Sequence, residues 1–181
     1  MKKTLIFLIT SLFTVGVLHA QWPSNVTTVE SKSNDSVIVS GDLAKGVLME
    51  DLSWAANSSN ACFPATQNLK FRGNHVLYAT SIPPRSILTI SVTPTDANGD
   101  LSIYGYMMGN NEYRVVPNLP SCISCEADHK WDRPWKGKVQ TSERKIEFQN
   151  PTQNTYNIVI GVAAPKDVIT GQFNLKIKLK S

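Results

Sequence analysis

The sequence predicts an all-β fold, an antiparallel two-sheet sandwich of jelly-roll or Greek-key type. Short segments in which apolar and polar residues alternate recur along the chain, and clusters of turn-forming residues separate them. Outside the N-terminus, no segment has the period of an amphipathic helix. About seven to nine short strands with regular turns are typical of a sandwich, and the chain carries roughly that number.

Residues 1–20 have the build of a secretory signal peptide. Lys2 and Lys3 precede an apolar run from Leu5 to Leu18, and Ala20 supplies the small residue expected before the cleavage point. The apolar run is too short for a stable membrane anchor. We therefore expect an exported chain, secreted or periplasmic, without a membrane span.

Length and charge limit what the remaining chain can be. Once residues 1–20 are set aside, the chain is long enough for one domain and cramped for two. The 18 Lys and Arg residues nearly balance the 14 Asp and Glu residues. A net charge of +4, part of which belongs to the signal peptide, gives no reason to expect a nucleic-acid partner.

The N-terminal third of the chain is predicted only in outline. Residues 21–35 are rich in Ser, Thr and Asn without a sustained period, so we expect a loose arm. A single domain then spans residues 36–181. Its first strand candidates are the short apolar runs 36–40 and 46–54, and residues 57–67 have the composition of a loop.

The densest pattern lies between Phe71 and Tyr106 and predicts three antiparallel strands. They are expected over residues 75–81, 87–93 and 100–108. In the middle strand, Leu88, Ile90 and Val92 alternate with hydroxyl residues, as in a half-buried strand. Two prolines break the first connection, and an Asn-Gly pair in the second readily takes the positive φ angles of a tight turn.

Residues 110–139 are predicted to form a long loop that carries function or a packing cluster of its own. Strands follow over residues 145–148, 155–162 and 171–180. In the last strand, apolar residues from Phe173 to Leu179 face one way, and Lys176, Lys178 and Lys180 face the other. Such a row of lysines is typical of an edge strand protected against aggregation, and its alternative role is to meet an acidic polymer or a membrane surface.

Five of these pieces follow one another in an informative order. They are Val76–Thr80, Pro84–Val92, Asp100–Tyr104, Tyr156–Val162 and Gly171–Ile177. Their order resembles that of the bacterial pre-peptidase C-terminal domain, a small secreted β-sandwich often attached to extracellular peptidases. The resemblance implies a non-catalytic accessory module, which in some relatives binds calcium or an extracellular polymer such as collagen. The long loop with two cysteines and the segment before Val76 depart from the pattern.

The function that fits this sequence best is an exported, non-catalytic module. It would bind an extracellular polymer, either a glycan or a matrix protein, or a protein of the cell envelope. One alternative is a structural envelope protein without a ligand site, and another is a small secreted hydrolase. We expect no enzyme, because the chain lacks a Gly-x-Ser-x-Gly elbow and neither His75 nor His129 lies in a recognisable catalytic setting.

A calcium site is the one cofactor that the sequence suggests. Asp96, Asn98 and Asp100 place oxygen-bearing side chains at alternate positions of one loop, and a loop of this kind can wrap a hard cation. The alternative is that these residues simply make the turn between two strands.

A binding surface is predicted around Trp131, Arg133 and Trp135, because flat aromatic faces beside charged donors suit a sugar or a peptide. Tyr104 and Tyr106 lie two apart on one strand and would extend this surface. The alternative for all four aromatic residues is packing against the sandwich core.

Cys62, Cys122 and Cys125 remain after export into an oxidising compartment. We expect a disulfide between Cys62 and either Cys122 or Cys125, which closes a long loop and leaves one free thiol. A bridge confined to Cys122 and Cys125, or zinc bound by both of them with His129, are the alternatives.

Overall fold

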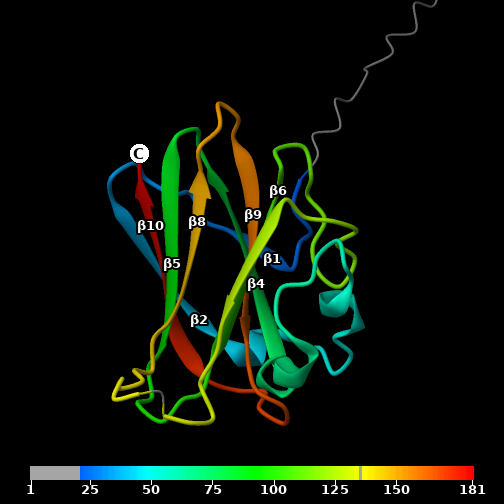
Figure 1. Ribbon diagram of the computed structural model, residues 1–181, viewed down its shortest axis with the longest axis vertical. Coiled ribbons are helices and arrows are strands. Elements are labelled where there is room, and N and C mark those ends of the chain that lie inside the picture. Colours follow the sequence, from blue (N-terminus) through cyan, green and yellow to red (C-terminus); the bar gives the residue numbers. More distant parts are fainter. Residues whose placement is uncertain (1–20, 135) are drawn as a thin grey trace, which may run out of the picture.

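The computed structural model describes residues 21–134 and 136–181 (Figure 1). The predicted signal peptide at residues 1–20 lies outside the described residues. Within the described part, no helix is long and apolar enough to cross a membrane.

Two packed sheets make up the protein, which confirms the predicted all-β sandwich (Figure 1). Sheet A contains β1 (Val26–Thr28), β3 (Val47–Leu48), β4 (Asn74–Ile82), β6 (Ser102–Gly109), β7 (Ser124–Asp128) and β9 (Tyr156–Ala163). Sheet B contains β2 (Ser36–Asp42), β5 (Ser86–Pro94), β8 (Arg144–Asn150) and β10 (Gln172–Lys180). Three short 3-10 segments complete the fold, namely η1 (Leu43–Lys45), η2 (Ser53–Ala56) and η3 (Ala65–Phe71).

The strand order is β1-β4-β9-β6-β7 in sheet A, with β3 beside β4, and β2-β10-β5-β8 in sheet B. Neighbouring strands run antiparallel, except that β1 runs parallel to β4. The first strand of sheet B therefore pairs with the last strand of the chain. Sequence neighbours are seldom sheet neighbours here, so most of the fold depends on contacts between distant segments.

The main core lies between the sheets and follows the predicted alternation. Ile90 and Val92 of β5 are fully buried and pair with Ile177 and Leu175 of β10. Each such side chain contributes roughly 1.5–3 kcal/mol when it is removed from water. The inward faces expected for these two strands are therefore confirmed.

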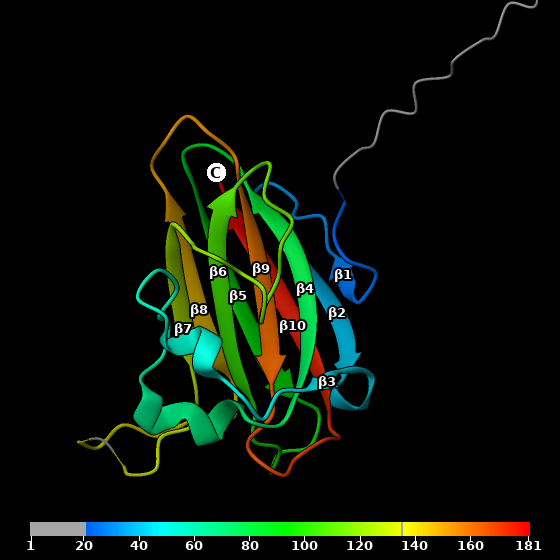
Figure 2. The same ribbon diagram turned by 90° about the vertical axis from the view of Figure 1, so that its right-hand side faces the viewer.

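The outer faces of the two sheets differ. The covered face is the outer side of sheet A, where Tyr104, Tyr106 and Val159 are fully buried. Residues 49–72, which include η2 and η3, lie over it, and Figure 2 shows this segment in front of β6 and β7. The open face is the outer side of sheet B, where alternate residues of β8 and β10 are exposed, among them Lys145 and Lys176.

Three local predictions are corrected by the structure. The arm at residues 21–35 is not loose throughout, since β1 pairs with β4 and Val29 is 5% exposed. Residues 46–54 form only the two-residue strand β3, and the chain then turns into η2. The lysine row does not protect an edge, because β10 is paired on both sides, with β2 and with β5.

Candidate functional site

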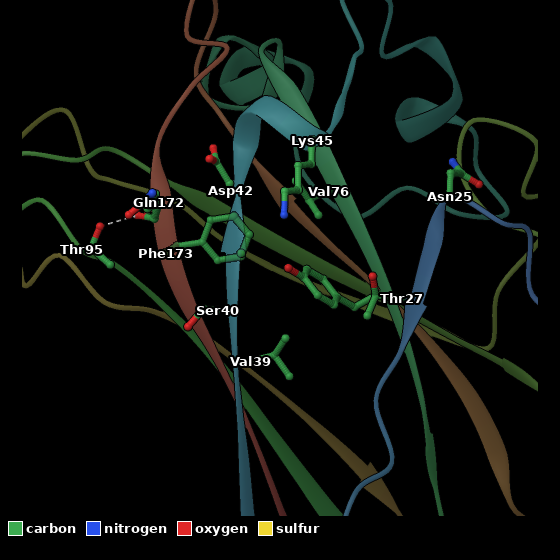
Figure 3. A pocket seen from close by; sticks show the side chains of 12 residues that line it. Asn25, Thr27, Val39, Ser40, Asp42, Lys45, Val76, Thr95, Gln172 and Phe173 are labelled. Carbon is green, nitrogen blue, oxygen red and sulfur yellow. Dashed lines mark hydrogen bonds between the residues drawn. The ribbon is translucent and has the colours of Figure 1, made fainter.

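The two sheets part along one side of the sandwich and leave a pocket with a volume of about 430 Å³ (Figure 3). Strand β2, at the edge of sheet B, forms one wall, and β1 and β4 of sheet A form the other. On the opposite side of the sandwich the sheets are joined, since the backbone N–H of Lys145 in β8 donates to Asp128 Oδ2 in β7 at 2.8 Å. The open side is therefore where a ligand can enter between the sheets.

Gly41 makes the floor of the pocket possible. It lies in β2 opposite Phe173, and a Cβ at this position would stand 2.3 Å from the Phe173 ring and 2.4 Å from the Tyr78 hydroxyl. The two rings meet edge to face, with centroids 6.3 Å apart. Because glycine has no side chain, these two aromatic groups can lie directly beneath the strand.

The Tyr78 hydroxyl is the most informative group in the pocket. The residue is only 3% exposed, and burial raises its pKa to about 12, so the phenol stays neutral at physiological pH. Among the described residues, none hydrogen-bonds to this hydroxyl, although it lines a space large enough for a ligand. Buried hydroxyls normally have a partner, so this one is available to a ligand or to water.

Charged and polar side chains form the rim. Figure 3 shows the Lys45 amine beside Val76, and Asn25 and Thr27 on the far side of the opening. Asp42 Oδ1 accepts the backbone N–H of Ala44 at 2.9 Å, which leaves the second carboxylate oxygen for another donor. The opening therefore offers a cation, an anion and neutral amide and hydroxyl groups around an apolar floor.

The predicted aromatic surface lies elsewhere. Trp131 is half-buried, and Gln140 holds its backbone, donating from Nε2 to the Trp131 oxygen at 3.2 Å. Arg133 is exposed, and Trp135 lies outside the described residues. None of the described members of this loop lines the pocket. A binding surface on this loop stays a prediction.

Tyr104 and Tyr106 do not extend any binding surface, so that part of the prediction is wrong. Both are fully buried in the covered face, with the Trp54 ring 5.8 Å and 6.2 Å from theirs. Burial raises the pKa of both phenols well above the usual range. The alternative of core packing is the one that the structure bears out.

His75 is also buried, at 2% exposure, and is unsuited to act as a base at the surface. Its Nε2 donates to the carbonyl oxygen of Phe71 at 2.5 Å, so the neutral ring accepts at Nδ1 from the Tyr104 hydroxyl at 2.9 Å. Burial lowers the pKa of His75 to about 4. The ring is therefore a neutral link between β4 and β6.

The predicted calcium loop has the geometry of a turn. Asp96 Oδ1 accepts the backbone N–H of Asn98 at 2.9 Å, and its carbonyl accepts that of Gly99 at 2.9 Å. Asp100 Oδ1 is buried without a hydrogen-bond partner among the described residues. Calcium binding by Asp96, Asn98 and Asp100 stays a prediction, which melting curves in calcium and in chelator would test against Asp100→Ala.

The three cysteines gather at one edge of the covered face, although each is a free thiol in this structure. Cys125 lies close enough to Cys62 and Cys122 to raise the pKa of both of their thiols. A disulfide from Cys62 remains a prediction that this proximity favours. Among the described residues, no group of three or more His, Cys, Asp or Glu side chains is placed to hold a metal, so the zinc alternative has no site.

These features define the class of protein as a two-sheet β-sandwich with a side pocket. No known protein family matches the chain, and no curated protein does. Solved structures do match in fold, and they include a pre-peptidase C-terminal domain of collagenase from Bacillus anthracis, the family that the strand order resembles. That match has 9% sequence identity and a TM-score of 0.40, and it covers 88% of this chain and 100% of the other.

Two further matches are of the same quality. A periplasmic inhibitor of g-type lysozyme from Aeromonas hydrophila is 9% identical, with a TM-score of 0.41 over 86% of this chain and 97% of the other. A surface-associated copper-binding protein from Methylomicrobium album is 11% identical, with a TM-score of 0.41 over 85% of this chain and 98% of the other. At this degree of similarity the matches say nothing about what this chain binds.

Sequence reasoning missed the pocket. Asn25 and Thr27 fall in the segment expected to be loose, and Gly41 served only to separate two strand candidates. One signal was present, because a glycine inside a strand pattern often marks a close approach of another group. The groups that approach Gly41 are Tyr78 of β4 and Phe173 of β10. No local sequence pattern identifies those partners.

Proposed function

We propose that this protein is an exported, non-catalytic β-sandwich module that binds a glycan of the cell envelope or the extracellular space, and that the side pocket receives one of its sugar units. The observation that carries the proposal is the Tyr78 hydroxyl, which lines the pocket without a partner among the described residues. Export rests on the signal peptide predicted at residues 1–20.

The chemistry of the rim favours a sugar over an apolar ligand. Each sugar hydroxyl both donates and accepts, and the rim supplies the Lys45 amine as a donor, the free Asp42 oxygen as an acceptor and the Thr27 hydroxyl as either. Val39 and Val76 give an apolar wall against which the C–H face of a ring can pack. A volume of about 430 Å³ lies within the usual range for small-ligand sites.

The proposal is tested by a glycan array with the chain that begins at residue 21, followed by titration of any glycan that binds. Tyr78→Phe removes a single oxygen, and Lys45→Ala removes the cation. Because each variant loses one hydrogen bond to the ligand, we expect affinity to fall by about 10-fold in each. Lys32→Ala, an exposed lysine outside the pocket, is the matched control and should bind as the wild type does.

Two outcomes would contradict this assignment. Binding that survives both pocket variants but is lost in Trp131→Ala would place the glycan on the loop of Trp131 and Arg133. Binding to no glycan, matrix protein or envelope protein would favour a structural role without a ligand site.

A further inference from the structure

A second site lies away from the pocket, where segment 49–72 meets the start of β7. Cys62 comes from the segment, and Cys122 and Cys125 come from the chain that enters β7. The Cys125 thiol donates to the carbonyl oxygen of Ala61 at 2.9 Å, and the Cys122 thiol donates to that of Ser59 at 3.4 Å. The chain just before Cys62 therefore holds both of the other thiols beside it.

Cys125 is the centre of this three-cysteine site. Its sulfur lies close enough to those of Cys62 and Cys122 to shift the pKa of both thiols. Two of the three pairings are thus in contact, and Cys125 belongs to both of them.

We propose that the three cysteines form a thiol–disulfide exchange site, in which Cys125 attacks a low-molecular-weight disulfide and either Cys62 or Cys122 completes the reaction. In the first step the Cys125 thiolate forms a bond to one sulfur of the disulfide R–S–S–R, the S–S bond breaks, and one thiolate RS⁻ leaves. In the second step Cys62 or Cys122 attacks the Cys125 sulfur and releases the second RS⁻. The two protein thiols lose two electrons and two protons, and the disulfide becomes two molecules of RSH.

The acidities of the three thiols support this division of roles. The hydrogen bond from Cys62 lowers the pKa of Cys125, and the same bond, together with burial, raises the pKa of Cys62. Burial raises the pKa of Cys122 to about 11. Cys125 is therefore the first to become a thiolate, and the thiolate is the form that attacks. Cys125 is half-buried, so part of its surface is open to a small disulfide.

The third cysteine allows the disulfide to move from one cysteine pair to another within one chain, and back again. When Cys62 and Cys125 are bridged, the Cys122 thiolate can attack the Cys125 sulfur, form the Cys122–Cys125 bridge and release Cys62. This exchange consumes no oxidant, because one S–S bond forms as the other breaks. The first bridge ties segment 49–72 to β7, whereas the second leaves the segment held by packing and hydrogen bonds.

The wild-type protein gives the first test. The chain from residue 21 is reduced, freed of reductant and treated with oxidised glutathione, and its disulfides are then mapped in unreduced peptides. We expect two of the three thiols to be lost without lasting attachment of glutathione. The map should contain Cys62–Cys125 and Cys122–Cys125 bridges. A Cys62–Cys122 bridge as the main product, or three thiols that stay free, would overturn the proposal.

Variants identify the attacking cysteine. When Cys62 and Cys122 are both replaced by Ser, Cys125 has no neighbour to complete the reaction and should retain one glutathione. Either single replacement should still allow an internal bridge to Cys125. Cys125→Ser should lose internal bridging altogether, and bridging at the wild-type rate in this variant would refute its central role. If a serine variant fails to fold, the disulfide map of the wild-type protein tests the proposal on its own.

Discussion

The covered face of sheet A and the open face of sheet B differ in whether a third layer packs against them. Every residue of β6 from Ser102 to Met108 is buried, because the strand is packed on both sides. In β10, buried and exposed residues alternate along the whole strand. The difference is already present in the sequence, where β6 reads SIYGYMMG and β10 reads QFNLKIKLK. A strand that is apolar on both faces requires a third layer, and segment 49–72 supplies it.

The first prediction removes a large side chain from the covered face. Phe71 is fully buried and stacks on Phe63 with ring centroids 3.9 Å apart. Phe71→Ala should lower the free energy of unfolding by about 3–5 kcal/mol, because it leaves a cavity that the layer cannot fill. Ile38→Ala on the open face is the control, since Ile38 is 63% exposed and its loss should cost less than about 0.5 kcal/mol. Equal losses in urea denaturation would show that segment 49–72 adds little stability.

The second prediction uses pH to weaken the covered face. The folded pKa of His75 is about 4, below the ordinary value of 6.5, so the unfolded chain binds the proton more readily between these values. Stability from this group is complete above pH 6.5 and is lost as the pH falls toward 4, by about 3 kcal/mol in total.

The measurement is urea denaturation of the wild type and of His75→Gln at several pH values between 4 and 7.5. The variant should be less stable at neutral pH, but its stability should fall less steeply with acid. Parallel curves for the two proteins would mean that His75 does not titrate as its burial implies.

The third prediction concerns the glycine whose lack of a side chain leaves room for the Tyr104 ring. Gly161 of β9 pairs with Tyr104 of β6, and a Cβ on Gly161 would lie 2.0 Å from that ring. Gly161→Ala should therefore destabilise the protein by about 1–3 kcal/mol through overpacking. Gly109→Ala is the matched control in the same sheet, since its nearest contact would be at 4.0 Å. Similar melting temperatures for both variants would contradict the close contact.

The sequence predicted the strands well because their alternation is local. The strand expected over residues 87–93 is β5 (Ser86–Pro94), and the one expected over 155–162 is β9 (Tyr156–Ala163). The short strand β7 was hidden inside the expected loop, because it pairs only with β6 and carries little pattern of its own.

The pocket could not be predicted in the same way. Thr27, Gly41, Tyr78 and Phe173 come from four separate strands, and the space between them depends on how far the two sheets diverge. Alternation assigns each residue to a face but does not specify which strands form the edges. The pairing of β2 with β10 decides that, and it joins residues more than a hundred positions apart.

The central place of β10 also has a consequence for the order of assembly. Sheet B has β10 between β2 and β5, so both of those strands need residues 172–180 to complete their pairing. Such non-local pairing makes folding slow. Removing residues 172–180 should therefore abolish folding of the whole domain. It should not give a folded domain that merely lacks one strand.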